Sequence, residues 1–270
     1  MKLWLLGVRG STPAPGPNFV RYGGHTSCVG VVPNGGREPT LLLDAGTGVR
    51  TLTDKLATGS FNGSILLSHL HWDHVEGIPF SRALDRPDTR ADLYLPGQGG
   101  ETPFDLLSKM MSPPHFPITP DGLKGSWTFN ETPDEKFKVE GFTVTAAEVE
   151  HKGGRTLGYR VEDEGHAIAY IPDHAPTNGM SDEVWALIDN VDVLLHDAQF
   201  VENERPIAED YGHATIEETI RLAEQAHVKT LVLFHHSPVR TDAELDLLGQ
   251  DIDSDIDVVI AREGMTIPLH

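Results

Sequence analysis

The chain has 270 residues, of which 39% are hydrophobic and 23% charged, so it can bury a sizeable core and is not compositionally disordered. Its 41 acidic side chains outnumber 21 basic ones, and the resulting formal charge of −20 disfavours stable binding to nucleic acid or an anionic membrane. The single cysteine, Cys28, cannot form an internal disulfide, and 14 histidines direct any metal chemistry toward nitrogen and oxygen ligands.

No apolar run approaches the ~18 residues that a membrane-spanning helix requires. The first eight residues are mostly apolar, but Arg9 ends this stretch near the lower length limit of a signal-peptide core. We therefore expect a first β-strand at this end of the chain, a location in the reducing cytoplasm, and no membrane partner.

The first 80 residues predict a sheet, because short apolar segments alternate with turn residues. Strands are expected at residues 2–8, 27–32, 40–44 and 64–68. A proline-rich excursion follows at 95–136, within which residues 104–111 can form a short helix. Loops of this length in a compact domain more often act as lids or binding loops than as linkers. We expect one domain over residues 1–270, with a lid-like insertion around 95–136.

Strands return after residue 136, and helices then alternate with strands. Strands are expected at 142–146, 159–161, 167–171, 193–195, 231–234 and 258–260. Helices are expected at 181–188, at 242–248, and after the capping box Thr215-Ile216-Glu217-Glu218. A strand-rich half followed by alternating strands and helices indicates two packed sheets with helices outside.

The most informative segment is Ser68-His69-Leu70-His71-Trp72-Asp73-His74, which follows an apolar strand and holds four potential metal ligands. In extended backbone His69 and His71 lie on the same side, while Asp73 and His74 fall where the chain turns from strand to helix. One short loop can therefore face two adjacent ions, and imidazoles with a carboxylate suit zinc, iron or manganese. A solvated His-rich loop is the alternative.

Further ligand-type side chains end later apolar strands. They are His151, Asp173 and the neighbouring pair His235 and His236. Each alone could be a structural hydrogen-bonding residue, but strand ends commonly build sites, and together with the histidine cluster these residues favour a dinuclear metal site. Asp44 also ends an expected strand, and it is either the hydrogen-bond partner of a ligand histidine or a turn cap.

The pattern His69-x-His71-x-Asp73-His74, followed by His151, Asp173 and His235, resembles the metallo-β-lactamase fold superfamily over nearly the whole chain. The resemblance implies a four-layer αββα sandwich, with two mixed β-sheets and helices outside. It also implies two divalent metal ions, zinc ahead of manganese or iron. One ion would be held by His69, His71 and His151, the second by Asp73, His74 and His235, and Asp173 would bridge them.

A narrower resemblance, to the ribonuclease Z-like and cyclic-phosphodiesterase branch, rests on three further segments: Leu194-Leu195-His196-Asp197-Ala198-Gln199-Phe200, Gly212-His213-Ala214-Thr215 and Phe234-His235-His236-Ser237-Pro238. In that branch an acidic residue and a non-ligand histidine act together beside the metals. The resemblance assigns these roles to Asp197 and His213, although Asp197 is one methylene shorter than the usual glutamate. It also favours His235 over His236 as the ligand.

These residues predict a dinuclear metal-dependent hydrolase, acting on a small, cyclic phosphodiester through a metal-bridging hydroxide. The expected catalytic residues are Asp73, Asp197 and His213. We expect His213 to protonate the leaving group, although it could instead cap the following helix. Arg155 and Arg240 are candidate sources of positive charge for the substrate.

The substrate prediction rests on what is missing relative to ribonuclease Z, which carries a tRNA-gripping arm between the third-motif histidine and the bridging aspartate. Here residues 152–172 leave room only for a hairpin, and the charge of −20 also argues against tRNA. Two other functions stay open: a carboxyl-ester, lactone or β-lactam hydrolase on the same metals, and a non-catalytic metal-binding scaffold. A homodimer is one of the assemblies that the sequence allows.

Overall fold

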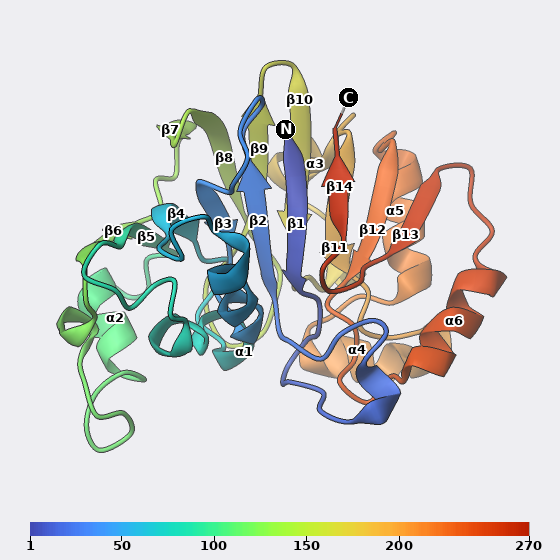
Figure 1. The fold of residues 1–270 in the computed structure, drawn as a ribbon. Helices are drawn as coiled ribbons and strands as arrows, with labels where there is room; N and C mark the ends of the chain where they lie inside the picture. The colour runs from blue at the N-terminus through green and yellow to red at the C-terminus, as the bar shows by residue number, and fades with distance from the viewer. Residues whose placement is uncertain (270) are drawn as a thin grey trace.

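The computed structural model describes residues 1–269 and contains two mixed β-sheets of seven strands each (Figure 1). The strand order is β14-β1-β2-β3-β4-β5-β6 in the first sheet and β13-β12-β11-β10-β9-β8-β7 in the second. With helices on their outer faces, these sheets form the four-layer αββα sandwich that the sequence predicted.

The elements have the following bounds. The first sheet contains β1 Lys2–Gly7, β2 Cys28–Val32, β3 Leu41–Leu43, β4 Asn62–Leu66, β5 Arg90–Leu95, β6 Ser126–Glu131 and β14 Thr266–Pro268. The second contains β7 Phe137–Val139, β8 Phe142–Val149, β9 Thr156–Asp163, β10 His166–Ile171, β11 Val193–Asp197, β12 Thr230–Phe234 and β13 Asp257–Ile260. The α-helices are α1 Trp72–Val75, α2 Pro103–Ser108, α3 Asp182–Ile188, α4 Arg205–Tyr211, α5 Ile216–Gln225 and α6 Asp242–Asp251.

The central core lies between the two sheets. Leu3 and Leu43 of the first sheet meet Tyr170 and Phe234 of the second in one buried apolar cluster. Successive side chains of a strand point to opposite faces, so Leu42 of β3 belongs instead to the cluster on the outer face of the first sheet. This alternation gives each sheet two apolar faces, and both must be covered.

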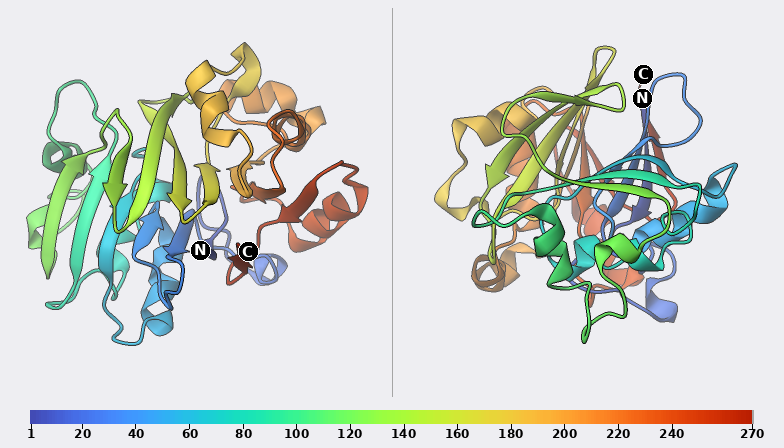
Figure 2. Two further views of the ribbon diagram at one scale, coloured as in Figure 1. Left: turned by 90° about the horizontal axis from the view of Figure 1, so that it is seen from above. Right: turned by 90° about the vertical axis from the view of Figure 1, so that its left-hand side faces the viewer.

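The helices cover the outer faces of the sandwich (Figure 2). Leu106 and Leu107 of α2 pack into the outer cluster of the first sheet. Leu187 of α3 and Ala223 of α5 pack into the outer cluster of the second sheet. No helix within residues 1–269 has the length and apolar character needed to cross a membrane.

The segment 95–136 is more regular than the sequence predicted. It contains α2, and its residues 126–131 are strand β6, which pairs in parallel with β5 at the edge of the first sheet. The helix expected within this segment is present as α2, whereas strand β6 was not expected there. Trp127 and Phe129 pack against the outer apolar cluster, and this tertiary contact with distant segments is not visible in the sequence of the strand itself.

Strand direction brings the ligand-type residues to one edge. Strands β10, β11 and β12 are parallel, and β8 runs the same way because β9 is antiparallel to both β8 and β10. Their carboxyl ends therefore share an edge of the second sheet, which faces the loop after β4 of the first sheet. Residues 152–172 contain the β9–β10 hairpin turn, as the short spacing predicted.

Candidate metal centre

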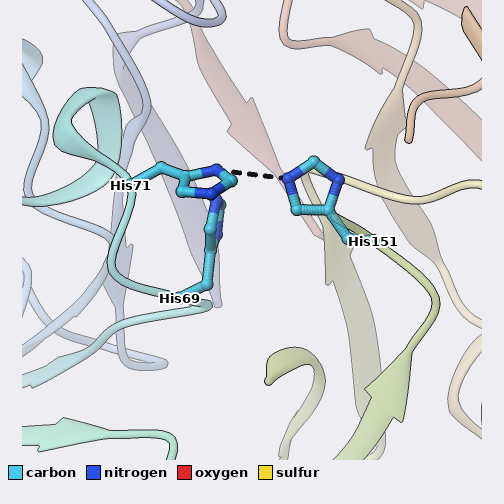
Figure 3. Close-up of side chains that lie close together, drawn as sticks. All are labelled: His69, His71 and His151. Carbon is cyan, nitrogen blue, oxygen red and sulfur yellow. Dashed lines mark hydrogen bonds between the residues drawn. The ribbon is translucent and has the colours of Figure 1, made fainter. Parts of the chain in front are cut away.

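The first group of ligand-type side chains consists of three imidazoles from two loops. His69 and His71 follow β4, and His151 follows β8, and one nitrogen of each lies within 4.8 Å of the others. Figure 3 shows the three rings converging, with His71 Nδ1 only 3.2 Å from His151 Nε2. Three imidazole nitrogens at this spacing match the ligand type and number that a divalent cation such as zinc takes from proteins.

Hydrogen bonds on the far nitrogens of these rings set their tautomers. His151 Nδ1 donates to the carbonyl oxygen of Gly212 at 2.6 Å, which leaves the Nε2 lone pair facing the group. His69 Nδ1 lies 3.0 Å from the Ser68 hydroxyl, while His69 Nε2 is buried without a hydrogen-bond partner. An unpartnered buried nitrogen is unfavourable unless an additional group occupies the space before it. The residues therefore fit a bound metal ion.

The second group lies beside the first. His74 Nε2 and His235 Nε2 are each 3.1 Å from Asp73 Oδ2, and the two nitrogens are 3.3 Å apart. On its far side His74 donates from Nδ1 to Asp44 Oδ2 at 2.7 Å. The other ring nitrogen of His74 is consequently free to bind a cation, as in the carboxylate–histidine pairs typical of metal sites.

Asp173 lies between the two groups. Its Oδ2 is 2.9 Å from His74 Nε2 and 3.9 Å from His69 Nδ1, and its Oδ1 is 3.3 Å from His235 Nε2 and 4.0 Å from His151 Nε2. One carboxylate thus approaches members of both groups. This is the position that the resemblance gave to the bridging residue.

The protonation states of His69 and Asp173 suit cation binding, whereas Asp73 and the other carboxylates around His74 outweigh burial and raise the pKa of His74 well above its ordinary value. Burial, together with the nearby His74, lowers the pKa of His69 well below its ordinary value, so His69 is neutral. Burial acts to raise the pKa of Asp173, but His235 and the other imidazoles around it outweigh burial and hold this pKa well below its usual range. Neutral imidazole and ionised carboxylate are the forms that bind metals.

A buried hydrogen-bonded pair, Asp197 and His213, adjoins the ligand groups. His213 Nδ1 donates to Asp197 Oδ2 at 2.8 Å, so the shorter side chain of aspartate still reaches the histidine. The carboxylate also accepts backbone N–H groups from Gln199 at 3.0 Å, His174 at 3.1 Å and Ala214 at 3.4 Å. Four donors fix this carboxylate at the end of β11, which in turn fixes the orientation of His213.

The charge of His213 follows from its neighbours. Burial acts to lower its pKa, but the Asp197 carboxylate outweighs burial and raises the pKa of His213 to about 9. His213 Nδ1 is also 3.4 Å from Asp173 Oδ1, so the pair lies in direct contact with the candidate ligands. The helix cap that could have explained His213 is supplied by Thr215, whose hydroxyl accepts the Glu218 N–H.

The adjacent histidines His235 and His236 have different surroundings. His235 enters the ligand group, whereas His236 Nε2 donates to the Ala261 carbonyl oxygen at 2.9 Å inside the protein. Burial lowers the pKa of His236 to about 3. The structure therefore places His235, and not His236, among the candidate ligands.

Other side chains considered from the sequence lie elsewhere. His174 Nδ1 and His196 Nε2 are 3.0 Å apart in a buried pair behind Asp197. Arg155 pairs with Asp134 and Glu148, and Arg240 pairs with Glu204. Neither arginine lines the pocket over the ligand groups, so the expected source of positive charge for a substrate is not found there.

Sequence reasoning missed the loop that follows β1. The Ser11 backbone N–H donates to Asp73 Oδ2 at 2.7 Å and holds this carboxylate in place. Gly10 must lack a side chain, because a Cβ there would lie 2.3 Å from His235 Nδ1. The signal in the sequence was the Gly10-Ser11 turn, but the partners are more than 60 residues away and could not be inferred from it.

The ligand groups form the floor of an open pocket of about 330 Å³. Its lining residues are Ser11, Leu70, His71, Trp72, Asp73, Asp173, His213 and His235. Among these described residues there is no lysine or arginine, so an anionic substrate would meet positive charge only from bound cations and from His213.

Comparisons with known proteins agree with this fold. Residues 40–236, more than half of the chain, match the sequence model of the beta-lactamase superfamily domain. Ribonuclease Z of Limosilactobacillus fermentum is 26% identical over 64% of this chain and 69% of its own length.

Several solved structures cover the whole of this chain, and two of them illustrate the match. A diphosphatase of the PhnP family has a TM-score of 0.73 and 18% identity over 98% of its own chain. Zinc-bound PqqB of Methylobacterium extorquens has a TM-score of 0.72 and 19% identity over its full chain. At these identities the structural matches establish the fold alone. The sequence match and the αββα architecture together show that the chain belongs to the metallo-β-lactamase superfamily.

Proposed function

We propose that this protein is a metal-dependent phosphodiesterase that hydrolyses small, including cyclic, phosphodiesters. The observation that carries the proposal is the Asp197–His213 pair, which adds a proton donor to a cluster of seven ligand-type side chains. A diester hydrolysis needs both parts, because the attacked phosphoryl group gains charge while the departing alkoxide requires a proton.

The ligand assignments are part of this proposal. His69, His71 and His151 would hold one divalent ion, and Asp73, His74 and His235 a second, with Asp173 shared between them. Zinc suits the nitrogen and oxygen donors of each set, and manganese or iron are alternatives. Ions bound in this way supply an activated water near neutral pH and Lewis acidity at the phosphoryl oxygens.

His213 would act as the general acid. Its Nδ1 is engaged by Asp197, so its Nε2 is the nitrogen that can hold a proton toward the pocket that the ring lines. The Asp197 carboxylate favours the protonated imidazole, and three of its four hydrogen-bond donors are backbone groups that cannot rotate away. The Ser11 N–H positions the Asp73 carboxylate. Asp73 would in turn orient the part of the second ligand group that faces the substrate.

The preference for a small substrate rests on the net charge of the chain and on the short segment between His151 and Asp173. The formal charge of −20 repels a long polyanion, and the β9–β10 hairpin leaves no arm between His151 and Asp173. The relatives named ribonuclease Z make RNA the substrate to compare against.

The test is a substrate screen with zinc-loaded and manganese-loaded protein. We expect turnover of bis(p-nitrophenyl) phosphate and of 2′,3′- or 3′,5′-cyclic nucleotides, loss of turnover with a chelator, and recovery with added metal. A precursor tRNA and p-nitrophenyl acetate serve as comparison substrates. Faster processing of the tRNA would replace this proposal with an RNA-processing nuclease, and faster ester hydrolysis would replace it with a carboxyl-ester hydrolase. No metal-dependent turnover of any substrate would indicate a binding scaffold.

A further inference from the structure

A second cavity of about 620 Å³ lies next to the metal pocket and belongs to none of the groups described above. The two cavities share Leu70 and Trp72 as lining residues, so they adjoin each other at this wall. Cavities of this size are typical of sites for small organic molecules, and the position places any occupant within reach of the candidate metal centre.

Three separate parts of the chain build the cavity. The loop and short helices after β4 contribute Val75 and Phe80, strands β5 and β6 contribute Leu93 and Phe129, and the segment between α2 and β6 contributes several more residues. The lining residues from that last segment are Met110, Met111, His115, Phe116, Pro120 and Leu123. The proline-rich segment 96–125 thus forms one wall of the cavity.

The lining is aromatic and thioether-rich. The rings of Phe80 and Phe116 meet edge to face, with centroids 5.6 Å apart, although Phe80 is 63% exposed. Trp72, on the wall shared by the two cavities, is 74% exposed. Large apolar side chains exposed together in a concave place are characteristic of binding sites, and aromatic rings and Met sulfur favour contact with a flat aromatic group.

We propose that this cavity binds an aromatic ester group of the phosphodiester whose phosphate lies at the metal centre, and so selects aryl over small alkyl esters. The inference rests on the proposed function for the identity of the phosphate group. It commits to a substrate group and not to a protein partner, because the cavity is concave, is of small-molecule size, and adjoins the metal pocket at Leu70 and Trp72.

The test compares two diesters of equal charge, diphenyl phosphate and dimethyl phosphate. Both are symmetric, so either ester position presents the same group to the cavity. Binding to the zinc-loaded protein is measured by isothermal titration calorimetry. Burial of one aromatic ring predicts that diphenyl phosphate binds at least about tenfold more tightly. Equal affinities for the two diesters would overturn the inference.

Substitutions of lining residues test whether this cavity causes the preference for diphenyl phosphate. Phe116→Ala and Met110→Ala should each weaken diphenyl phosphate binding by about three- to tenfold and leave dimethyl phosphate binding unchanged. Leu247→Ala removes an apolar side chain that is 59% exposed on α6, and it should leave both affinities unchanged. Metal content and circular dichroism check that each variant is folded, and Phe116→Leu should retain most of the preference if volume and apolarity are what the site uses.

The outcomes separate this inference from the proposed function. Tight aryl binding without turnover of any diester would leave the cavity assignment standing and contradict the phosphodiesterase. Turnover of diesters with no aryl preference, or with a preference that Phe116→Ala and Met110→Ala both leave intact, would overturn the cavity assignment alone. A dimer dissociated by Phe80→Glu, with unchanged diester affinities, would instead assign the cavity to contact between copies of the chain.

Discussion

Asp44 orients His74 from the side of the ring opposite the other ligand-type residues: His74 Nδ1 donates a hydrogen bond to Asp44 Oδ2 at 2.7 Å. The same buried carboxylate accepts the Ser68 N–H at 2.7 Å, the Ser68 hydroxyl at 2.8 Å and the Tyr170 hydroxyl at 2.8 Å. Asp44 therefore joins the ligand loop after β4 to β10 of the opposite sheet. Of the two roles that the sequence left open for Asp44, the structure supports the partner of a ligand histidine.

Asp44→Asn should weaken metal binding with little change in fold. Asn keeps the size of the side chain and tolerates the φ of 58° at this position, but it removes the negative charge that orients His74. Loss of such a partner typically costs about 10- to 100-fold in metal affinity. Zinc titration against a chromophoric chelator measures the change, and Asp121→Asn, on an exposed turn, is the matched control. Unchanged zinc affinity in Asp44→Asn would contradict the orienting role.

Asp173→Ala should abolish the paired metal site. In the proposed arrangement this carboxylate is shared by both ions, and without it two cations would repel each other across a short gap with no charge between them. Elemental analysis of protein purified without chelator should give about two ions per wild-type chain and one or fewer in the variant, with nearly all activity lost. Two ions in the variant, or activity within tenfold of wild type, would contradict the bridging assignment.

Substitution of His235 and substitution of His236 should have different effects on metal content. His235→Ala removes a candidate ligand and should lower metal content, whereas His236→Ala should leave metal content unchanged. His236 is buried and bonded to the Ala261 carbonyl, so its loss should cost roughly 1–3 kcal/mol of unfolding free energy, because the carbonyl is left without a partner. Urea unfolding of the metal-free proteins gives the stability difference. Metal loss in His236→Ala with full content in His235→Ala would reverse the assignment.

Local patterns in the sequence were sufficient for much of the fold. Apolar runs located β3, β4, β10, β11 and β12, and the ligand-type residues stand directly after such runs. Strands that run in the same direction end at the same edge of a sheet. The positions of His151, Asp173 and His235 after strand ends in the sequence therefore predict that these side chains lie close together. The capping box before α5 marked the start of that helix for the same local reason.

The remaining features depend on contacts between distant segments. Strand β6 is stabilised by pairing with β5 and by packing of Trp127 and Phe129, and neither contact is visible in its own short sequence. The Ser11 N–H meets Asp73 across 62 residues of chain, and a backbone donor has no sequence signature. The apolar cavity is likewise built from three segments, so the aromatic residues of 95–136 gave no sign of which face they line.

The role of His213 predicts a difference between substrates. If His213 protonates the leaving oxygen, His213→Ala should keep its metal content but lose ~10²–10⁴-fold in turnover of a cyclic nucleotide, whose alkoxide is a poor leaving group. Nitrophenolate departs without a proton, so the loss with bis(p-nitrophenyl) phosphate should be much smaller. The measurement is kcat with each substrate, together with metal content, and His166→Ala is the matched control because His166 begins β10 at the edge opposite Asp173.

Asp197→Asn should show the same dependence on the substrate. The amide keeps the size of the side chain, and its single oxygen can still accept the His174 and Ala214 N–H groups, but it does not stabilise a protonated imidazole. Two residues that act as one unit give similar, non-additive losses. The double variant should therefore be little worse than His213→Ala. Equal losses on both substrates, or loss of metal, would show that His213 positions the site. Additive losses in the double variant would show that Asp197 acts on something other than His213.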